Sequence, residues 1–321
     1  GSIYTMPVKF GIPMIEGNKD IIAGITDLTT EADAAESQKD SYGKLQFFSD
    51  FSIAPSYLIQ GTIDNSIPAW MNEDGTLNEN AVKEYLEQVN RIWQTQKNAI
   101  EETKKAYQMG DDWADSDHSG YMDISGSVTS LLAKVDTVAA GGLLSPEGLV
   151  SLDSARKVDP DLDYKLLNGQ SENCFYPRSA VGVSAKASEK EAAEKFVKFL
   201  FEEESQRASN TEGLAVNSKV YEDMAYWKMG KSSGDTIGSI GASYDTGDGN
   251  IKQIEMDEII PEDEAIQNIM DLGKTLTVPA KSNQIIRNAV TESGEKYLNG
   301  ETGLDDAVKE IMQEVNLYLS E

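Results

Sequence analysis

An acidic run at residues 111–123 holds the side chains best suited to chemistry. It reads DDWADSDHSGYMD and contains His118, the only histidine of the chain. From Asp115 onward, its oxygen-bearing residues follow the first nine positions of an EF-hand calcium loop. The twelfth position, where that loop needs a bidentate glutamate, is Gly126. The cage of ligands cannot close, so the spacing predicts no EF-hand and leaves weak calcium binding as an alternative.

Two carboxylates of the same run could instead act as the acid and the base of a glycosidase. The candidates are Asp112 together with Asp115 or Asp117. That chemistry needs one carboxyl group whose pKa is raised by burial. Carboxylates in so polar a run are expected to stay solvated and ionised. A single histidine also argues against a catalytic triad, so no catalytic residue is predicted.

We prefer a third interpretation, in which this region forms a strand, a turn and a helix. Residues 121–124 would be the strand, Gly126 the turn and residues 127–132 the start of the helix. A helix N-terminus presents free N–H groups that can bind ligand oxygens. A resemblance to one known family, set out below, implies ligand contacts here, from Trp113, Tyr121, Asp123, Ser125 and Ser127.

Composition limits the class of protein. The 321 residues suffice for two lobes, and 28 basic against 55 acidic residues give a net charge of −27. Such a charge repels nucleic acid, which is excluded as a partner, and anionic lipid. The single Cys174 cannot form an internal disulfide, and no Cys–His cluster suits zinc. No metal and no cofactor are predicted.

The stretch 179–200 carries the clearest pattern. Residues 180–183 are a short apolar run that predicts a buried strand. Ser188 and Glu191 have the spacing of a capping box, and an apolar stripe follows them at helical spacing. A strand followed by a capped amphipathic helix is a common α/β unit.

Three blocks in this order resemble one known family. They are the Ser188-x-x-Glu191-Ala-Ala helix, the turn Gly213-x-x-Val216-Asn217, and the C-terminal segment 297–319. Together they are similar to the carbohydrate-type (family 1) extracellular solute-binding proteins of ABC importers. The resemblance covers the whole chain loosely and residues 160–321 more closely.

The resemblance implies an α/β, helix-rich, periplasmic-binding-protein-like (type II) fold with two lobes. Segment 3–10 resembles the family strand that runs towards the hinge, before which relatives have roughly a hundred residues of the first lobe. Gly1-Ser2 resembles a cloning remnant. We therefore expect a fold truncated at its N-terminus, with exposed strand edges prone to self-association.

The expected division of the chain follows from the same resemblance. Residues 1–14 and 179–225 would be the remainder of lobe 1. Lobe 2 would comprise residues 15–178 and 265–321. Residues 226–264, rich in Gly, Ser and Asp, are expected to be a surface excursion that is partly mobile. Within lobe 2, residues 139–142 (AAGG) are predicted to be a flexible turn.

The remaining site predictions concern the cleft between the lobes. Asp50 and Phe51 precede an expected helix, Phe175 and Tyr176 lie at the second hinge crossing, and Asn283 precedes a C-terminal helix. Neutral sugars are held by aromatic faces and by polar groups that satisfy their hydroxyls. The four Trp, thirteen Tyr and eight Phe of the chain could supply such faces.

The function implied by the resemblance is capture of a sugar or oligosaccharide outside the cell and delivery to the permease subunits of an ABC transporter. Such a protein would be a monomer and not an enzyme. It would be a membrane-anchored lipoprotein at the cell surface, or periplasmic. Two alternatives stay open: a carbohydrate-active enzyme, and a binder of another solute such as a peptide, a polyamine or a metal.

Overall fold

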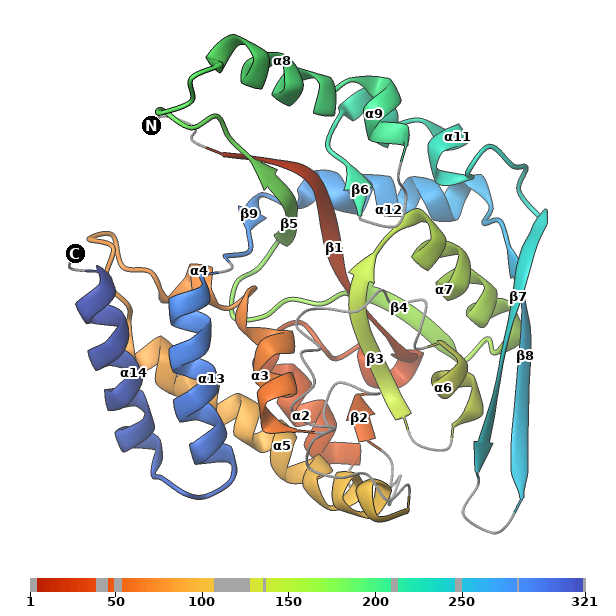
Figure 1. Cartoon of the computed structure of the whole chain (residues 1–321). Helices are drawn as coiled ribbons and strands as arrows, with labels where there is room; N and C mark the ends of the chain where they lie inside the picture. Colours follow the sequence, from red (N-terminus) through yellow and green to blue (C-terminus); the bar gives the residue numbers. More distant parts are fainter. Residues whose placement is uncertain are drawn as a thin grey trace.

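The computed structural model describes residues 5–38, 46–48, 54–106, 128–134, 137–208, 213–245, 250–281 and 283–319. Its axis is one long strand, β1 (Met6–Asn18), which runs from the top of the molecule into its centre (Figure 1). The sequence prediction of a strand near the N-terminus is confirmed, although the strand continues past Phe10.

The two halves of β1 belong to different groups of strands. Its first half pairs antiparallel with β5 (Cys174–Val181) and β6 (Leu214–Ala215). Its second half pairs antiparallel with β3 (Thr137–Leu144) and β4 (Leu162–Leu166). Two short strands extend these groups: β9 (Val278–Pro279) runs parallel to β5, and β2 (Gln46–Phe48) runs parallel to β3. We call the region around β5 and β6 the upper part and the region around β3 and β4 the lower part.

Helices cover both faces of the lower sheet. One face carries α1 (Lys19–Ile22), α2 (Leu28–Gln38), α3 (Pro55–Ile63), α4 (Ile67–Trp70), α5 (Glu79–Ala106), α13 (Gln284–Leu298) and α14 (Leu304–Leu319). The other face carries α6 (Val128–Ala133) and α7 (Pro146–Val158). Because side chains alternate along a strand, Ile15 of β1 packs into the first helical layer while Ile12 and Met14 pack into the second.

The amphipathic helices form where the apolar spacing predicts them. In α5 the buried stripe is Val82, Tyr85, Leu86, Val89, Ile92 and Trp93, so Trp93 is a core residue as expected. In α14 it is Ala307, Val308, Ile311 and Val315. Burial of such stripes supplies most of a helix's stability in a folded protein.

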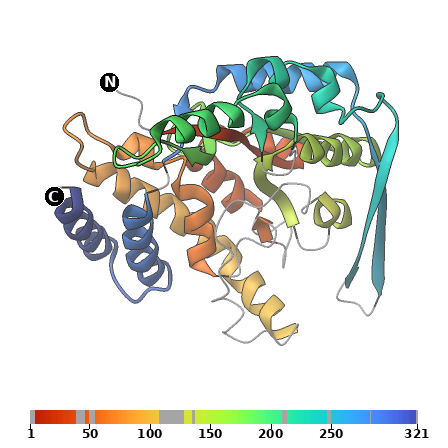
Figure 2. The ribbon, with the colours of Figure 1, turned by 45° about the horizontal axis from the view of Figure 1, so that its top comes forward.

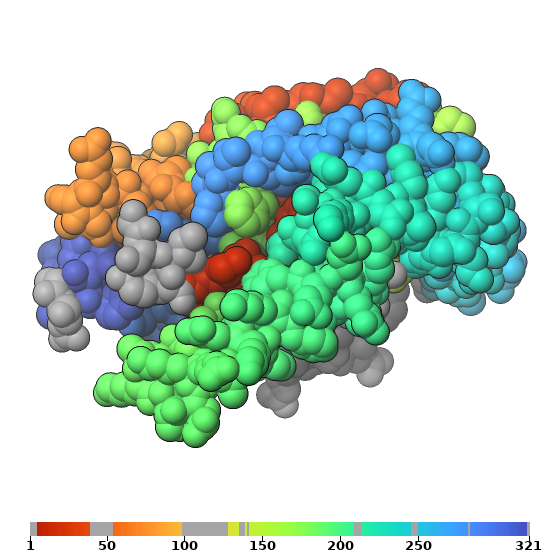
Figure 3. Space-filling view, turned by 90° about the horizontal axis from the view of Figure 1, so that it is seen from above, coloured from red at the N-terminus to blue at the C-terminus, as the bar shows by residue number. Residues whose placement is uncertain are grey.

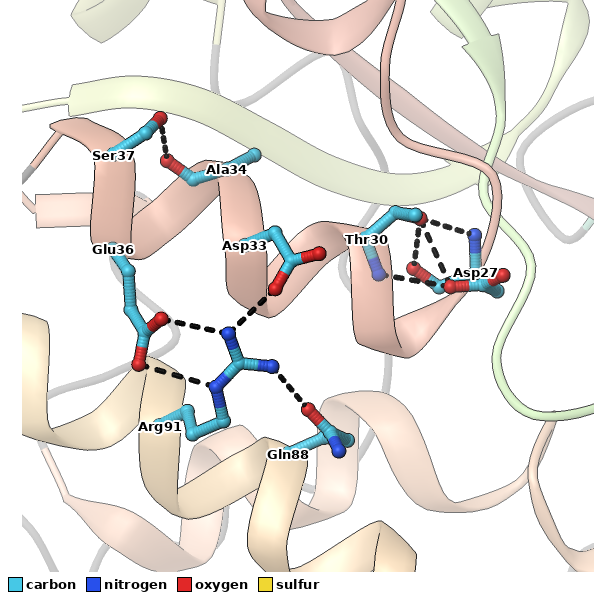
Figure 4. Close-up of polar contacts among 8 residues, drawn as sticks. All are labelled: Asp27, Thr30, Asp33, Ala34, Glu36, Ser37, Gln88 and Arg91. Atoms are coloured by element: carbon cyan, nitrogen blue, oxygen red, sulfur yellow. Dashed lines mark hydrogen bonds and ion pairs between the residues drawn. The ribbon is translucent and has the colours of Figure 1, made fainter.

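An arginine fastens α2 to α5 (Figure 4). Arg91 of α5 donates from Nε and Nη2 to the two carboxylate oxygens of Glu36, at 3.1 and 2.7 Å, and from Nη2 to Asp33 at 2.5 Å. The start of α2 is capped by Asp27, whose Oδ1 accepts from the Thr30 N–H at 2.8 Å. These contacts fix the helical layer beneath the sheet.

The upper part is small. Its helices are α8 (Lys190–Leu200), α9 (Glu203–Arg207), α10 (Ser218–Tyr221), α11 (Met224–Trp227) and α12 (Asp263–Thr275). The predicted turn into a helix is confirmed, since Asn217 caps α10 by accepting from the Lys219 N–H at 3.0 Å. Residues 265–275, expected in lobe 2, lie in α12, whose buried residues share one core cluster both with Tyr221 and Trp227 and with Leu149 and Leu152 of α7. The lobe boundaries themselves stay a prediction.

Two details of the stretch 179–200 were predicted wrongly. Residues 180–183 are exposed or half-buried, and only 180–181 belong to β5. The N-cap of α8 is Glu189, whose side chain makes no capping hydrogen bond, so the capping box at Ser188 does not form. The predicted apolar stripe exists, but no residue of α8 is buried.

Glycine misled the sequence prediction in two places. Residues 139–142 form part of the central strand β3, where Gly141 and Gly142 lie opposite Ile15 and Met14. The strands β7 (Thr236–Asp245) and β8 (Ile251–Ile259) pair antiparallel as a hairpin, which runs along one edge of the molecule (Figure 1, Figure 2). Small residues weaken the alternating pattern that marks a strand, but backbone pairing does not need their side chains.

No helix in the described ranges is long and apolar enough to cross a bilayer.

Candidate ligand-binding site

Three segments of the chain, which we call crossings, pass between the upper and lower parts, and they meet at one point. β1 crosses at Gly11 and Ile12, where its partner changes from Tyr176 of β5 to Leu144 of β3. β5 is the second crossing, and the segment that follows β9 is the third, tied to β5 by the Ala280 N–H donating to the Phe175 carbonyl at 2.8 Å.

A small apolar cluster marks this meeting point. Leu143, Tyr176 and Ala280 pack together, separate from the two large cores, and each is at most 7% exposed. A Cβ atom on Gly11 would lie 3.1 Å from the Leu143 Cδ1 atom. Glycine at this position therefore lets β1 pass close to the cluster.

Two helix N-termini begin next to the cluster. Ser145 precedes α7 and accepts from the Gly148 N–H at 3.0 Å. Asn283 precedes α13 and accepts at Oδ1 from the N–H groups of Ile285 and Ile286, at 3.0 and 3.2 Å. The first turn of a helix carries more N–H groups than one cap can satisfy, so these two ends can bind ligand oxygens.

A buried ion pair holds the third crossing in place. Arg287 Nη1 donates to Asp64 Oδ2 at 2.7 Å, and the Asp64 carbonyl accepts from the Lys281 N–H at 3.0 Å. Burial raises the pKa of Asp64 to about 6, while the Arg287 charge acts in the opposite direction. The pair joins the end of α3 to the start of α13.

Three of the predicted ligand residues are described. Tyr176 belongs to the cluster itself, and Asn283 caps α13. Phe175 points its ring edge-on to Phe10, with 6.2 Å between ring centroids, and packs against the core cluster that holds residues of both the upper and the lower part. Tyr176 thus lies on the second crossing and Asn283 follows the third, whereas Phe175 contributes to packing beside them. A ligand contact by each of the three stays a prediction.

The other predicted site residues lie outside the described ranges. They are Asp50, Phe51, Trp113, Tyr121, Asp123, Ser125 and Ser127. The calcium and glycosidase hypotheses for residues 111–123 lie there too and stay untested. The described part of the chain contains no cluster of His, Cys, Asp and Glu that could hold a metal ion. The helix expected after Gly126 is confirmed from Val128.

Sequence reasoning missed five residues of this region: Leu143, Ser145, Ala280, Asp64 and Arg287. One signal was available, because Ser145-Pro146 is a typical helix start, with a capping residue before a proline in the first turn. The buried ion pair joins positions far apart in sequence, and no local pattern predicts it.

Seen from above, the surface is hollowed between green α8 and the blue C-terminal segments, and part of the red N-terminal segment shows at the floor (Figure 3). A separate pocket of about 510 Å³ lies between α7, β4 and α12. Its cations are paired with aspartates: Lys19 with Asp161, and Lys157 with Asp153. This pocket shares no lining residue with the cluster.

Comparison with known proteins adds a family and a fold. The family model for bacterial extracellular solute-binding proteins matches residues 3–207. A search of curated proteins finds no match.

Several solved structures are similar to the whole chain. A putative oligosaccharide periplasmic-binding protein from Synechococcus sp. MITs9220, in complex with zinc, superposes with a TM-score of 0.54 at 12% identity, over 99% of this chain and 73% of that one. An ABC transporter solute-binding protein from Agrobacterium vitis S4 with bound D-mannitol gives 0.51 at 12% identity, over 100% and 73%. The GacH receptor of Streptomyces glaucescens, solved unliganded and with acarbose, gives 0.50 at 12% identity, over 100% and 72%. At this identity the likeness shows the fold, and it confirms the predicted two-lobed, periplasmic-binding-protein-like class.

Proposed function

Because this chain belongs to the family of bacterial extracellular solute-binding proteins, we propose that it captures a sugar or oligosaccharide outside the cell and delivers it to an ABC transporter permease. The observation that carries the proposal is the meeting of three crossings at Leu143, Tyr176 and Ala280, beside the N-termini of α7 and α13. Relative movement of the two parts about these crossings would open and close the site, so they would act as a hinge.

The chemistry of the site suits a neutral polyol. Helix N–H groups donate to sugar hydroxyls, and an aromatic ring such as Tyr176 packs against the apolar C–H face of a sugar ring. The related structures with D-mannitol and with acarbose support this class of ligand. Binding energy gained in the closed state shifts the population towards closure, which a permease can recognise.

The protein would release the ligand without altering it chemically. The family is one of binding proteins, which supports release of the ligand without a chemical step. The family description places the protein outside the cytoplasm. Attachment by a lipid anchor, action as a monomer and contact with permease subunits are further parts of this proposal.

A ligand screen tests the proposal. Mono- and oligosaccharides, mannitol, calcium and spermidine would be compared by thermal shift, and hits measured by titration calorimetry with chromatography of the recovered ligand. We expect one saccharide or polyol to raise the melting temperature and to be recovered intact. Tyr176→Leu removes the aromatic face and should weaken the binding of this ligand by about fivefold to tenfold.

The matched control is Tyr318→Leu, which changes a tyrosine on α14 that is 41% exposed. It should bind as the parent does. Breakdown of a glycan would support an enzyme instead, and Asp112→Asn would then test the carboxylate pair. Salt-sensitive binding of spermidine alone would favour a cationic solute over a sugar.

A further inference from the structure

The hairpin β7–β8 begins and ends in the upper part but lies against the lower part. Its chain neighbours are α11 and α12. Its length runs down beside α7 and α6, on the same side in both ribbon views (Figure 1, Figure 2). A hairpin placed in this way spans the boundary between the two parts.

Polar contacts fasten the hairpin to α7 near its base. The Ile259 N–H donates to Ser154 Oγ at 2.9 Å, and Ser154 Oγ lies 3.4 Å from the Ile259 carbonyl oxygen. One residue along, Ser151 Oγ donates to Glu258 Oε1 at 2.8 Å. Both serines lie one turn apart on α7, so they hold two successive residues of β8.

Further contacts fasten the distal half of the hairpin to α6. Lys252 Nζ donates to the carbonyl oxygens of Ala133 and Leu132, at the end of α6, where helix carbonyls lack partners within the helix. The hydroxyl groups of Thr129 and Tyr244 lie 2.9 Å apart, which adds a contact from β7. The hairpin is therefore held along its length and not only at its base.

The burial pattern of β8 agrees with this docking. Residues 252, 254, 256 and 258 are half-buried or buried, whereas 251, 253, 255 and 257 are exposed. Met256 is 1% exposed and shares a core cluster with Leu149 and Leu152 of α7. One face of the strand is thus part of the protein interior, and the other faces solvent.

The end of the hairpin continues into a helix that is fixed to the upper part. In α12, the carbonyl oxygens of Ile269 and Met270 accept from the Tyr221 hydroxyl at 3.3 and 3.2 Å. A Cβ atom on Gly273 would lie 1.9 Å from the same hydroxyl oxygen, so only glycine permits this approach. Movement of α12 away from α7 would therefore have to pull the hairpin off its docking face.

We propose that the hairpin β7–β8 is a clamp that ties α12 of the upper part to α6 and α7 of the lower part. The clamp keeps this flank together, so relative motion of the two parts takes place on the opposite flank, where α8 and α13 lie (Figure 1). The inference rests on the docking contacts alone and holds whichever solute the protein binds.

Hydrogen exchange measured by mass spectrometry on the whole chain tests the clamp. The loosened variant is Lys252→Met with Glu258→Ala, which removes the side chains that reach α6 and Ser151. Amides of α6 and of the first turns of α12 should exchange about fivefold faster or more, as expected when local opening becomes easier. The matched control is Gln253→Met with Glu255→Ala, on the exposed face of the same strand, and it should exchange as the parent does.

A disulfide provides the complementary measurement. Ser154→Cys and Ile259→Cys would be added to the loosened variant, at the place where the Ser154 hydroxyl accepts from the Ile259 backbone N–H. Oxidation should restore slow exchange in α6 and α12, and reduction should abolish it again. Unchanged exchange in the loosened variant would overturn the clamp, as would faster exchange that oxidation fails to reverse.

Discussion

Asp64 and Arg287 form an ion pair between the end of α3 and the first turn of α13. The Nη1–Oδ2 distance is 2.7 Å, and the two side chains are only 10% and 14% exposed. The Asp64 carbonyl also accepts from the Lys281 N–H. The pair therefore fixes the chain at the point where it enters the lower part beside the ligand-site cluster.

Removal of the Arg287 cation should lower the free energy of unfolding. Arg287→Met leaves the Asp64 carboxylate buried without its partner, and we expect the free energy of unfolding to fall by about 3 kcal/mol. Urea denaturation near neutral pH measures the change. Adding Asp64→Leu to the same chain should recover a large part of the loss, because the orphaned charge is then gone.

A surface ion pair between α13 and α14 provides the comparison. Lys296 and Glu310 lie 3.3 Å apart and are 50% and 52% exposed. Lys296→Met should change the free energy of unfolding by less than about 1 kcal/mol. Similar losses for Arg287→Met and Lys296→Met would contradict a special role for the buried pair.

Glu31 should make stability depend on pH. It is 1% exposed on α2, and burial raises its pKa to about 8, with a smaller contribution from the nearby Asp27 charge. A carboxyl group whose pKa is higher in the folded than in the unfolded state favours folding when protonated. Its contribution is present below pH ~4.3, the pKa of an unperturbed glutamate, and is lost as the pH rises through 8.

The test of this dependence is Glu31→Gln. Urea denaturation should give similar stabilities for parent and variant in mild acid, and a more stable variant above the Glu31 pKa. The parent would also lose stability through the lower pKa of Asp64, about 6, and this loss should persist in the variant. Parallel pH profiles for parent and Glu31→Gln would refute the assignment to Glu31.

Glu16 predicts a stabilising substitution. It lies on β1 opposite Tyr164 and is 0% exposed, and neither carboxylate oxygen has a hydrogen-bond partner among the residues that the structure describes. Burial raises its pKa well above the usual value, although the Arg156 charge opposes this. Glu16→Met keeps the length of the side chain and removes the polar group, so the free energy of unfolding should rise by about 1–3 kcal/mol at neutral pH.

Glu255→Met, on the exposed face of β8, is the matched change and should have little effect. Destabilisation by Glu16→Met would mean that the carboxyl group contributes to folding, and the proposed cost of burying it would be wrong. The fold would then depend on an interaction of Glu16 outside the described residues.

The sequence predicts those parts of the fold that depend on local spacing. The apolar stripe of α5 and the strand β1 are predicted by their apolar patterns, because each element must bury one apolar face. The hairpin β7–β8 escapes prediction because Gly238 and Gly241 interrupt the alternation that backbone pairing tolerates. Prediction from a local pattern fails where glycine stands in place of the side chains that make up the pattern.

The candidate site was predicted only in part for a related reason. Tyr176 and Asn283 could be placed because they stand at segment ends that resemble the family. Leu143 and Ala280 reach the same point because β3 pairs with β1 and β9 pairs with β5. These pairings join distant parts of the sequence, and neither residue type predicts them. The spacing predicts the apolar stripe of α8, but a pattern shows only which face can be covered and not what covers it.

The exposed apolar face of α8 leads to the final prediction. Phe196 and Phe199 of α8 are 59% and 52% exposed, although soluble monomers rarely present adjacent large apolar side chains on one helix. We expect weak, concentration-dependent self-association through this face, opposed by repulsion between chains of net charge −27. Added salt screens the repulsion and leaves apolar contact intact, so association should increase with ionic strength.

Sedimentation velocity at low and high salt measures this effect. Phe196→Gln with Phe199→Gln should lower the association at high salt, whereas Lys195→Gln, an exposed change on the same helix, should not. Association driven by charge would show the opposite salt dependence and would fade as ionic strength rises. A chain that stays monomeric at every salt concentration would show that the exposed α8 face is tolerated in water, and α8 would then not be an association surface.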